Sequence, residues 1–301
     1  MCTRVVSTTV VALVIALLFA YSDPGRRFLL DESRLNADAR GKIIVITGAT
    51  KGIGRQLSLL YAAAGAKLLL VARTQNALEE VSKRALELGA QSTEIIAVDL
   101  GTKEGCEEVV SYAASQQERI DMLILNHIIG YWGDWITEFR EKEYFEDLLF
   151  RVNVLGYTRI SMPLLPHLER SKGRLVVVSS AAAKIASPKT APYAMTKSAV
   201  QAFFESLRQD LYIHKSNVSI TICVLGNIAS KNALKNTKGD LQHLAWSGTR
   251  ETAVAIAKAA ALRFEVLHFP YFELASMIIL RSIVPSFADW LTRMIVRPYW
   301  A

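Results

Sequence analysis

The segment KIIVITGATKGIG, residues 42–54, joins an apolar run to a glycine-rich turn. Its first six residues are mostly β-branched or apolar, which is typical of a strand buried on both faces. The glycines after it let the backbone turn sharply and approach an anion closely, and the helix that follows offers free N–H groups to that anion. A glycine-rich loop between a strand and a helix predicts a dinucleotide cradle. The residues expected to form it are Gly48, Thr50, Lys51, Gly52, Ile53 and Gly54.

Apolar runs of the same kind recur along the chain and alternate with helical stretches. Leu78, Val81, Ala85 and Leu88, for example, repeat with helical spacing. Strands buried on both faces and linked by helices form a parallel sheet with right-handed crossovers. The pattern predicts a doubly wound, Rossmann-like α/β sheet in one domain, residues 41–270. The expected strands are 42–47, 67–72, 93–100, 120–126, 173–180 and 217–226, and the segment 261–269 could supply a short last strand.

Composition narrows the class of protein. The chain has 301 residues, of which 51% are hydrophobic and 21% charged, so it can bury a sizeable core. Its formal charge is +7, but no run of five or more Lys or Arg occurs. A nucleic-acid surface usually clusters its positive charge, so we expect no nucleic-acid partner. Cys2, Cys106 and Cys223 lack metal-ligand spacing, and we expect no metal site.

Both termini indicate contact with lipid. Residues 5–21 carry no charge, a length at the short end of the range for a membrane-spanning helix. We expect residues 1–22 to be a membrane anchor, with a cleaved signal peptide as the alternative, and residues 23–40 to be a polar linker. Residues 271–301 mix aromatic, aliphatic and Arg side chains, and Arg281 and Pro285 interrupt the apolar run. This segment is interpreted as a membrane-associated or dimer-forming segment that does not span a bilayer.

The charges beside the cradle indicate which dinucleotide binds. An NAD site needs a carboxylate about 20 residues after the glycine loop, at the end of the second strand. Arg73 occupies that place here, and Lys51 adds a second cation within the loop. Two cations favour a 2′-phosphate, so the pattern predicts NADP(H). Asp99, which ends the third strand, could accept a hydrogen bond from the adenine amino group or could cap the next helix.

The segment PYAMTKSAV, residues 192–200, carries a tyrosine and a lysine one helical turn apart. Positions i and i+4 of a helix share one face, so Tyr193 and Lys197 could reach a common point. A free phenol has a pKa of about 10. A nearby cation favours the phenolate and lowers that pKa, which brings the phenol towards the working range of a general acid or base.

The glycine loop TGATKGIG, the serine of VVVSS and the segment YAMTK together resemble the short-chain dehydrogenase/reductase family. Tyr193 follows Ser180 by thirteen residues and Lys197 follows four later, as in that family. The resemblance implies hydride transfer between a nicotinamide and a carbonyl or carbinol carbon. Tyr193 would exchange the proton and Ser180 would polarise the reacting oxygen. The resemblance also implies that Lys197 lowers the phenol pKa and binds the nicotinamide ribose, and that Asn153 holds a water in the proton relay.

Three parts of the family pattern are altered here. The family's Asn-Asn-Ala-Gly is replaced by LNHI, residues 125–128. Asn126 can still make the family's contacts to the sheet beside the cofactor, and His127 is interpreted as a structural histidine rather than a catalytic one. After the sixth strand, Leu225-Gly226 replaces the family's Pro-Gly, and Ser230 replaces a nearby threonine. Ile228 lies where backbone contacts to the carboxamide are expected.

Several segments are similar to one branch of the family, the 11β-hydroxysteroid dehydrogenases of type 1 and their type 1-like relatives. These segments are MLILNHI, VVVSS, NVSITICVLG and the apolar amino terminus. The resemblance implies NADP(H), a steroid-like substrate and a homodimer. It also implies a single-pass anchor in the endoplasmic reticulum membrane with the catalytic domain in the lumen, secretion after signal cleavage being the alternative.

We therefore expect an NADP(H)-dependent oxidoreductase that acts on a hydrophobic ketone/alcohol pair resembling 11-oxo and 11β-hydroxysteroids. The aromatic residues Tyr131, Trp132 and Trp135 suggest a lipophilic substrate that arrives from the bilayer, although packing alone would also explain them. One alternative is a reductase of retinoids or other lipid carbonyls. Another is an NADPH-binding pseudoenzyme or scaffold, which the complete set of four family residues disfavours.

Overall fold

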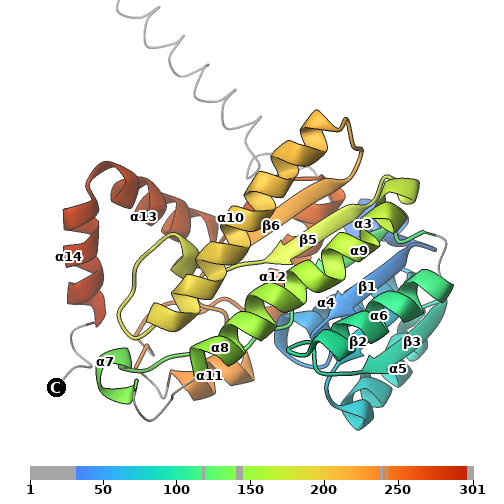
Figure 1. Ribbon diagram of the computed structural model, residues 1–301, viewed down its shortest axis with the longest axis horizontal. Coiled ribbons are helices and arrows are strands. Elements are labelled where there is room, and N and C mark those ends of the chain that lie inside the picture. The colour runs from blue at the N-terminus through green and yellow to red at the C-terminus, as the bar shows by residue number, and fades with distance from the viewer. Residues whose placement is uncertain (1–31, 117–118, 140–144, 238–239, 242, 297–301) are drawn as a thin grey trace, which may run out of the picture.

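Seven parallel strands form the centre of the computed structural model, in the order β3-β2-β1-β4-β5-β6-β7 (Figure 1). The structure describes residues 32–116, 119–139, 145–237, 240–241 and 243–296. All the predicted strands are present, including the short last one, and the doubly wound α/β fold is confirmed. The strands are β1 (Ile43–Thr47), β2 (Lys67–Ala72), β3 (Ser92–Ala97), β4 (Met122–Leu125), β5 (Arg174–Val178), β6 (Ser219–Leu225) and β7 (Val266–Phe269).

Helices cover both faces of the sheet. One face is packed by α4 (Gly52–Ala63), α5 (Gln75–Leu88) and α12 (Thr249–Ala261). The other is packed by α6 (Lys103–Gln116), α9 (Gly156–Ser171) and α10 (Ala191–Ile213), which lie across the near side of the sheet in Figure 1. Successive strand residues alternate between the two cores: Ile44 and Ile46 face the first and Val45 faces the second. Both faces are therefore apolar, which is why the strands read as continuous hydrophobic runs.

The strand order reverses between β1 and β4, and this reversal creates the crevice in which ligands bind in open α/β sheets. The register aligns Ile46 of β1 with Ile124 of β4, so the segments that follow both strands lie side by side. Short elements surround the carboxyl ends of the strands. They are α7 (Trp135–Glu138), α8 (Phe145–Phe150), the π-helix η1 (Arg151–Leu155), the 3₁₀-helix η2 (Ala181–Ala183) and α11 (Lys231–Asn236).

Part of the segment expected to be a linker is a helix packed on the domain. Residues Glu32–Ala39 form α3, and Leu35 and Ala39 are buried in the first core. Asp38 accepts two hydrogen bonds from the Arg174 guanidinium, at 2.5 and 2.8 Å, at the start of β5. Burial opposes ionisation of this carboxyl, but Arg174 and Lys42 outweigh it and lower the pKa of Asp38. The ion pair ties α3 to the centre of the sheet.

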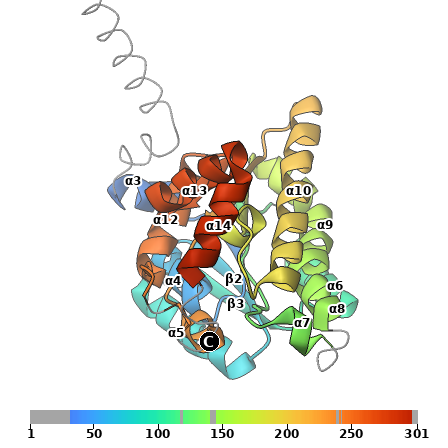
Figure 2. The ribbon, with the colours of Figure 1, turned by 90° about the vertical axis from the view of Figure 1, so that its left-hand side faces the viewer.

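The carboxyl-terminal segment forms two helices, α13 (Tyr271–Ile283) and α14 (Pro285–Val296). They lie side by side (Figure 2), and α13 contacts β7 at the edge of the sheet. Phe272, Ile283 and Trp290 are at least half exposed on them. Among the helices of the described residues, none is both long and apolar enough to cross a bilayer. The anchor expected over residues 1–22 lies outside the described residues.

Replacing Asp38 with Ala should destabilise the fold. The Arg174 side chain is only 8% exposed, so the change leaves a buried guanidinium without its main partner. Breaking a fully buried pair costs about 3–5 kcal/mol, and we expect about 2–3 kcal/mol here because Asp38 is partly exposed. The loss would be measured as the free energy of unfolding in urea at pH 7. Lys42→Met is the control, because Lys42 lies 3.6 Å from Asp38 near the surface and should cost little. Equal stability of Asp38→Ala and wild type would contradict this account.

Candidate active site

The glycine turn after β1 packs against the first residues after β4. Gly48 and Gly52 have positive φ angles of 67° and 53°, which favour glycine. A Cβ on Gly54 would lie 2.2 Å from the Gly48 carbonyl oxygen and 2.5 Å from the side-chain nitrogen Nδ2 of Asn126. Asn126 Nδ2 in turn donates to the carbonyls of Thr47 and Gly48, at 3.2 Å each. The prediction that Asn126 stabilises the sheet beside the turn is confirmed.

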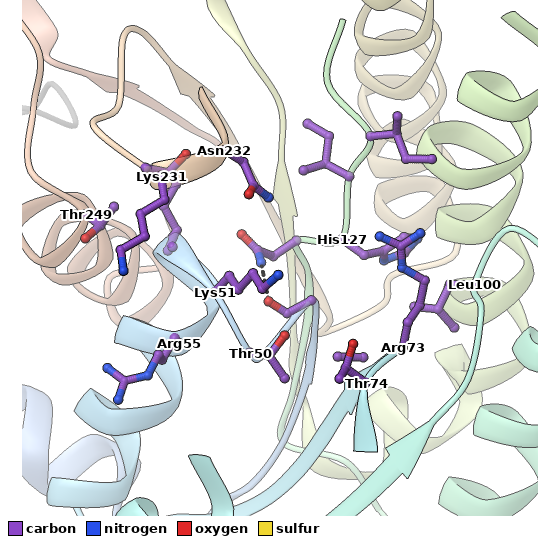
Figure 3. A pocket seen from close by; sticks show the side chains of 18 of the residues that line it. Thr50, Lys51, Arg55, Arg73, Thr74, Leu100, His127, Lys231, Asn232 and Thr249 are labelled. Carbon is purple, nitrogen blue, oxygen red and sulfur yellow. Dashed lines mark hydrogen bonds between the residues drawn. The ribbon is translucent and has the colours of Figure 1, made fainter. Parts of the chain in front are cut away.

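A cavity of about 800 Å³ opens above this turn (Figure 3). Most of the residues predicted to bind the dinucleotide line it, but Gly54, Ile228, Tyr193 and Lys197 do not. Gly54 lies beneath the turn, and the buried Ile228 is next to the lining residue Ala229. The predicted residues in the lining are Gly48, Thr50, Lys51, Gly52, Ile53, Arg73, Asp99 and Asn126.

The cavity has more positive charge around it than we predicted. Lys51 and Arg73 line it as expected, and Arg55 and Lys231 are further cations in its lining (Figure 3). Arg55 forms an exposed ion pair with Glu80 at 3.5 Å. The sequence offered only a weak signal for Lys231, as the residue after the expected Ser230. Its position depends on α11 lying over the turn, where a Cβ on Gly52 would come within 3.3 Å of Ser230.

Asp99 has a local structural contact as well as a place in the cavity. Its Oδ1 accepts a hydrogen bond from the Gly101 N–H at 2.9 Å, so the side chain holds the turn before α6. Asp99 does not cap α6, because the Thr102 hydroxyl accepts from the Gly105 N–H at 3.0 Å in the first turn of that helix. Because Asp99 also lines the cavity, contact with an adenine stays a prediction.

Ser180 and Tyr193 meet beside the carboxyl end of β5. Ser180 caps η2, where its hydroxyl accepts from the Ala182 N–H at 3.2 Å, and it lies close enough to the Tyr193 phenol to lower its pKa. Tyr193 lies in the first turn of α10 and is partly buried. Two of the four predicted catalytic side chains thus lie beside each other.

The expectation that Lys197 lowers the Tyr193 pKa is wrong in this structure. Burial raises the pKa of Tyr193 to about 12, although the nearby Ser180 side chain opposes that rise. Lys197 is fully buried one turn further along α10, and its Nζ donates to the Val178 carbonyl at 2.9 Å. Burial lowers the pKa of Lys197 to about 7, so this group loses much of the charge that the phenol would need from it.

Asn153 lies in the π-helix η1 and connects the loop after β4 to α10. Its side chain exchanges two hydrogen bonds with the backbone of Ile129, at 2.8 and 2.9 Å, and donates to Thr196 at 3.2 Å. Ile129 lines the cavity, and Thr196 is the neighbour of Lys197. π-Helical turns are frequent at functional sites. Asn153 therefore joins the cavity wall to the helix that carries Tyr193 and Lys197.

Ile228 and Ser230 are held in the loop after β6. A bridge pairs Ile228 with Ser247, and the flanking Ala229 N–H donates to the Ser247 carbonyl at 2.9 Å. The Ser230 hydroxyl accepts from the Ala233 N–H at 3.1 Å and caps α11. This loop closes one side of the cavity.

His127 is buried at the end of β4 and shares a hydrogen bond of 2.9 Å with the Thr47 hydroxyl. Burial, together with the nearby Lys197, lowers the pKa of His127 to about 3, so the ring is neutral. It is therefore not a proton donor at neutral pH, which agrees with its interpretation as a structural histidine.

Comparison with known proteins gives the same assignment over most of the chain. Residues 42–240 match the short chain dehydrogenase family. The hydroxysteroid 11-beta-dehydrogenase 1-like protein of Xenopus tropicalis is 36% identical over 249 residues, which cover 82% of this chain and 85% of the relative. The protein of that name from Danio rerio is 37% identical over 252 residues, 83% of each chain.

Solved structures agree in fold at lower sequence identity. L-sorbose reductase from Gluconobacter frateurii, complexed with NADPH and L-sorbose, is 23% identical with a TM-score of 0.69, over 76% of this chain and 95% of that one. A short chain dehydrogenase/reductase from Burkholderia phymatum, in complex with NAD, is 20% identical with a TM-score of 0.73, over 83% and 96%. With the family match and the two relatives above 30% identity, the conclusion is direct: this chain is a member of the short-chain dehydrogenase/reductase family.

Proposed function

We propose that this protein is an NADP(H)-dependent oxidoreductase that transfers hydride between the nicotinamide and a hydrophobic ketone/alcohol pair. The observation that carries the proposal is the proximity of Ser180 and Tyr193, with Lys197 one turn further along the same helix. A phenol and a hydroxyl beside each other can hold one carbonyl oxygen between them and give it a proton.

The glycine turn fits a dinucleotide. A side chain at Gly54 would clash with the Gly48 backbone, so the turn stays narrow only with glycine there. A narrow glycine turn lets a pyrophosphate approach the backbone closely. Lys51 and Arg73 in the lining favour the extra phosphate of NADP(H) over NAD(H). When bound, the nicotinamide supplies or accepts the hydride.

The protonation of Tyr193 suits reduction. With a pKa of about 12 the phenol keeps its proton at neutral pH, so it can donate that proton to the alkoxide that develops from a ketone. Ser180 would hold the same oxygen by a hydrogen bond. We assign Lys197 to the nicotinamide ribose and Asn153 to the proton relay, as the family resemblance implies.

A steroid-like substrate is supported by the names of the relatives and by one aromatic cluster. Tyr131 packs edge-on against Trp135, with ring centroids 5.4 Å apart, and the Gly133 N–H donates to the Lys189 carbonyl. This places the aromatic segment next to the residues that precede Tyr193. We propose 11-oxo and 11β-hydroxysteroid-like compounds first and retinoids or other lipid carbonyls second. A pseudoenzyme that binds NADPH as a sensor or scaffold is the alternative from another class.

We further propose that the protein acts at the endoplasmic reticulum membrane as a homodimer, with residues 1–22 as the anchor and the catalytic domain in the lumen. The apolar side chains on α13 and α14 support lipid contact or dimer contact by residues 271–301. Secretion after cleavage of the amino-terminal segment is the alternative.

Tyr193→Phe should greatly slow turnover while NADPH still binds. Loss of the general acid should lower kcat by about 10²–10⁴-fold, because the substituted ring has no proton to give. NADPH oxidation would be followed by absorbance with a panel of ketosteroids, retinal and simple quinones. Tyr212→Phe is the matched control, since Tyr212 is 82% exposed near the end of the same helix. NADPH binding without turnover of the whole panel by the wild type would favour the sensor.

Gly54→Ala should weaken dinucleotide binding. The new methyl group meets backbone at 2.2 Å, so the turn must open, and we expect NADPH to bind at least about tenfold more weakly and stability to fall by about 1–3 kcal/mol. Binding would be titrated by NADPH fluorescence and stability by thermal unfolding. A Cβ on Gly248 meets only ordinary contacts at 3.5 Å, so Gly248→Ala serves as the control. Unchanged binding in Gly54→Ala would exclude this turn as the cradle.

Arg73→Ala should weaken NADPH far more than NADH. A charge-assisted hydrogen bond to the 2′-phosphate contributes about 1.5–3 kcal/mol, which corresponds to roughly a 10–100-fold loss for NADPH alone. Both dissociation constants would be measured by calorimetry. The control is Arg84→Ala, whose guanidinium pairs with Glu87 on the outside of α5. If both cofactors weaken equally, Arg73 does not recognise the phosphate.

A further inference from the structure

A chain of buried contacts connects the glycine turn to the lysine of the active site. Thr47, the last residue of β1, accepts hydrogen bonds from the Asn126 N–H at 2.9 Å and shares one with His127 Nδ1 at 2.9 Å. The imidazole of His127 then packs against the ring of Tyr157 on α9, with centroids 4.7 Å apart. Lys197 Nζ lies over the same Tyr157 ring, 5.2 Å from its centroid.

Tyr157 and Lys197 also share an acceptor. The Tyr157 hydroxyl donates to the Val178 carbonyl at 3.3 Å and Lys197 Nζ donates to the same oxygen at 2.9 Å. Tyr157 is fully buried, so its ring forms a fixed wall beside the lysine. A movement of this ring would change both the position of Nζ and its access to water.

Space for the imidazole is provided by a glycine on the neighbouring helix. A Cβ on Gly156 would lie 2.7 Å from His127 Nε2, so only a residue without a side chain leaves room for the ring at this point. The family motif places a small residue at position 127, and the larger ring here therefore fills space that Gly156 leaves open. His127 and Gly156 together determine where the Tyr157 ring lies.

The groups around Lys197 are neutral near pH 7. On its own helix lies Tyr193, on α9 Tyr157 and after β4 His127, and Cys223 of β6 lies near Tyr157. Burial raises the pKa values of the two tyrosines and of Cys223, and it lowers that of His127. A neutral, apolar surrounding penalises the ammonium form, which is consistent with a lysine pKa of about 7.

We propose that His127 is a positioning residue for Lys197: its ring holds Tyr157 against the lysine and joins that pair to Thr47 at the glycine turn. The side chain does not touch the reacting atoms. It keeps Lys197 Nζ enclosed and holds it in a fixed position relative to the glycine turn. The importance of this for turnover rests on the proposed function, whereas the effect on Lys197 itself does not.

Nuclear magnetic resonance of protein labelled with ¹³C at lysine Cε tests the proposal. The Lys197 signal would be assigned by its loss in Lys197→Met, and its midpoint of titration measured in each variant. His127→Asn can keep the bond to Thr47 but removes the ring, so water reaches Nζ. The midpoint should rise from near pH 7 by at least about one unit. His127→Phe keeps a ring against Tyr157 and should leave the midpoint within a few tenths of a unit. His167→Asn, near the end of α9, is the remote control.

Turnover provides the second measurement. With the proposed function correct, His127→Asn should lower kcat by about 10–100-fold with little change in KM for the ketone, because Nζ is misplaced rather than lost. His127→Phe should mainly weaken NADPH, since it loses the bond to Thr47. A wild type without turnover whose Lys197 midpoint still rises in His127→Asn overturns the proposed function and supports the positioning role.

The positioning role is overturned if folded His127→Asn keeps the wild-type midpoint. Should that variant not fold, Tyr157→Leu removes the same wall from the other side, and the same rise in midpoint is expected. A loss of thermal stability in either variant with no change in the midpoint would show that His127 only supports the fold.

Discussion

The side-chain amide of Asn126 spans the junction of β1 and β4, and the geometry of the active site depends on it. One Nδ2 group donates to two successive carbonyls, Thr47 and Gly48, at the point where the strand order reverses. Those carbonyls belong to a turn that must remain narrow, because Gly54 lies directly behind it. The crevice is therefore built from backbone atoms that have little freedom to move.

Burial determines the protonation of the reacting groups more than direct charge pairing does. The phenol of Tyr193 keeps its proton because its surroundings disfavour the phenolate. The same loss of hydration makes the proton of Lys197 unusually labile. Tyr193, whose ionised form is an anion, and Lys197, whose ionised form is a cation, thus both shift towards their neutral forms. In buried surroundings, this arrangement favours a site that donates a proton to a substrate oxygen, which fits the reductive direction proposed for the enzyme.

The side of the site that would face a substrate is assembled from distant segments. Asp240 accepts from Trp132 Nε1 at 2.9 Å and from Lys189 Nζ at 2.8 Å, so one carboxylate joins three loops. His243 lies near the last turn of α14, within hydrogen-bonding distance of the Ile295 carbonyl at 3.2 Å. The loops before α10 and after α11 are thereby connected to the aromatic segment and to the carboxyl-terminal helices. Substrate choice would follow from how these segments fit together, and none of them alone defines it.

The sequence alone was sufficient to predict the parts of this protein that depend on residues close together in the chain. The strand and helix periods, the glycine turn and the Ser180–Tyr193–Lys197 spacing all concern near neighbours, whose geometry follows from backbone sterics. Tertiary structure alone decided what depends on distant neighbours. It brought Lys231 over the glycine turn, docked α3 through Asp38 and Arg174, and raised the Tyr193 pKa that spacing predicted would fall. The reason is that desolvation and long-range packing depend on which atoms the rest of the chain places around a group, and sequence spacing does not report them.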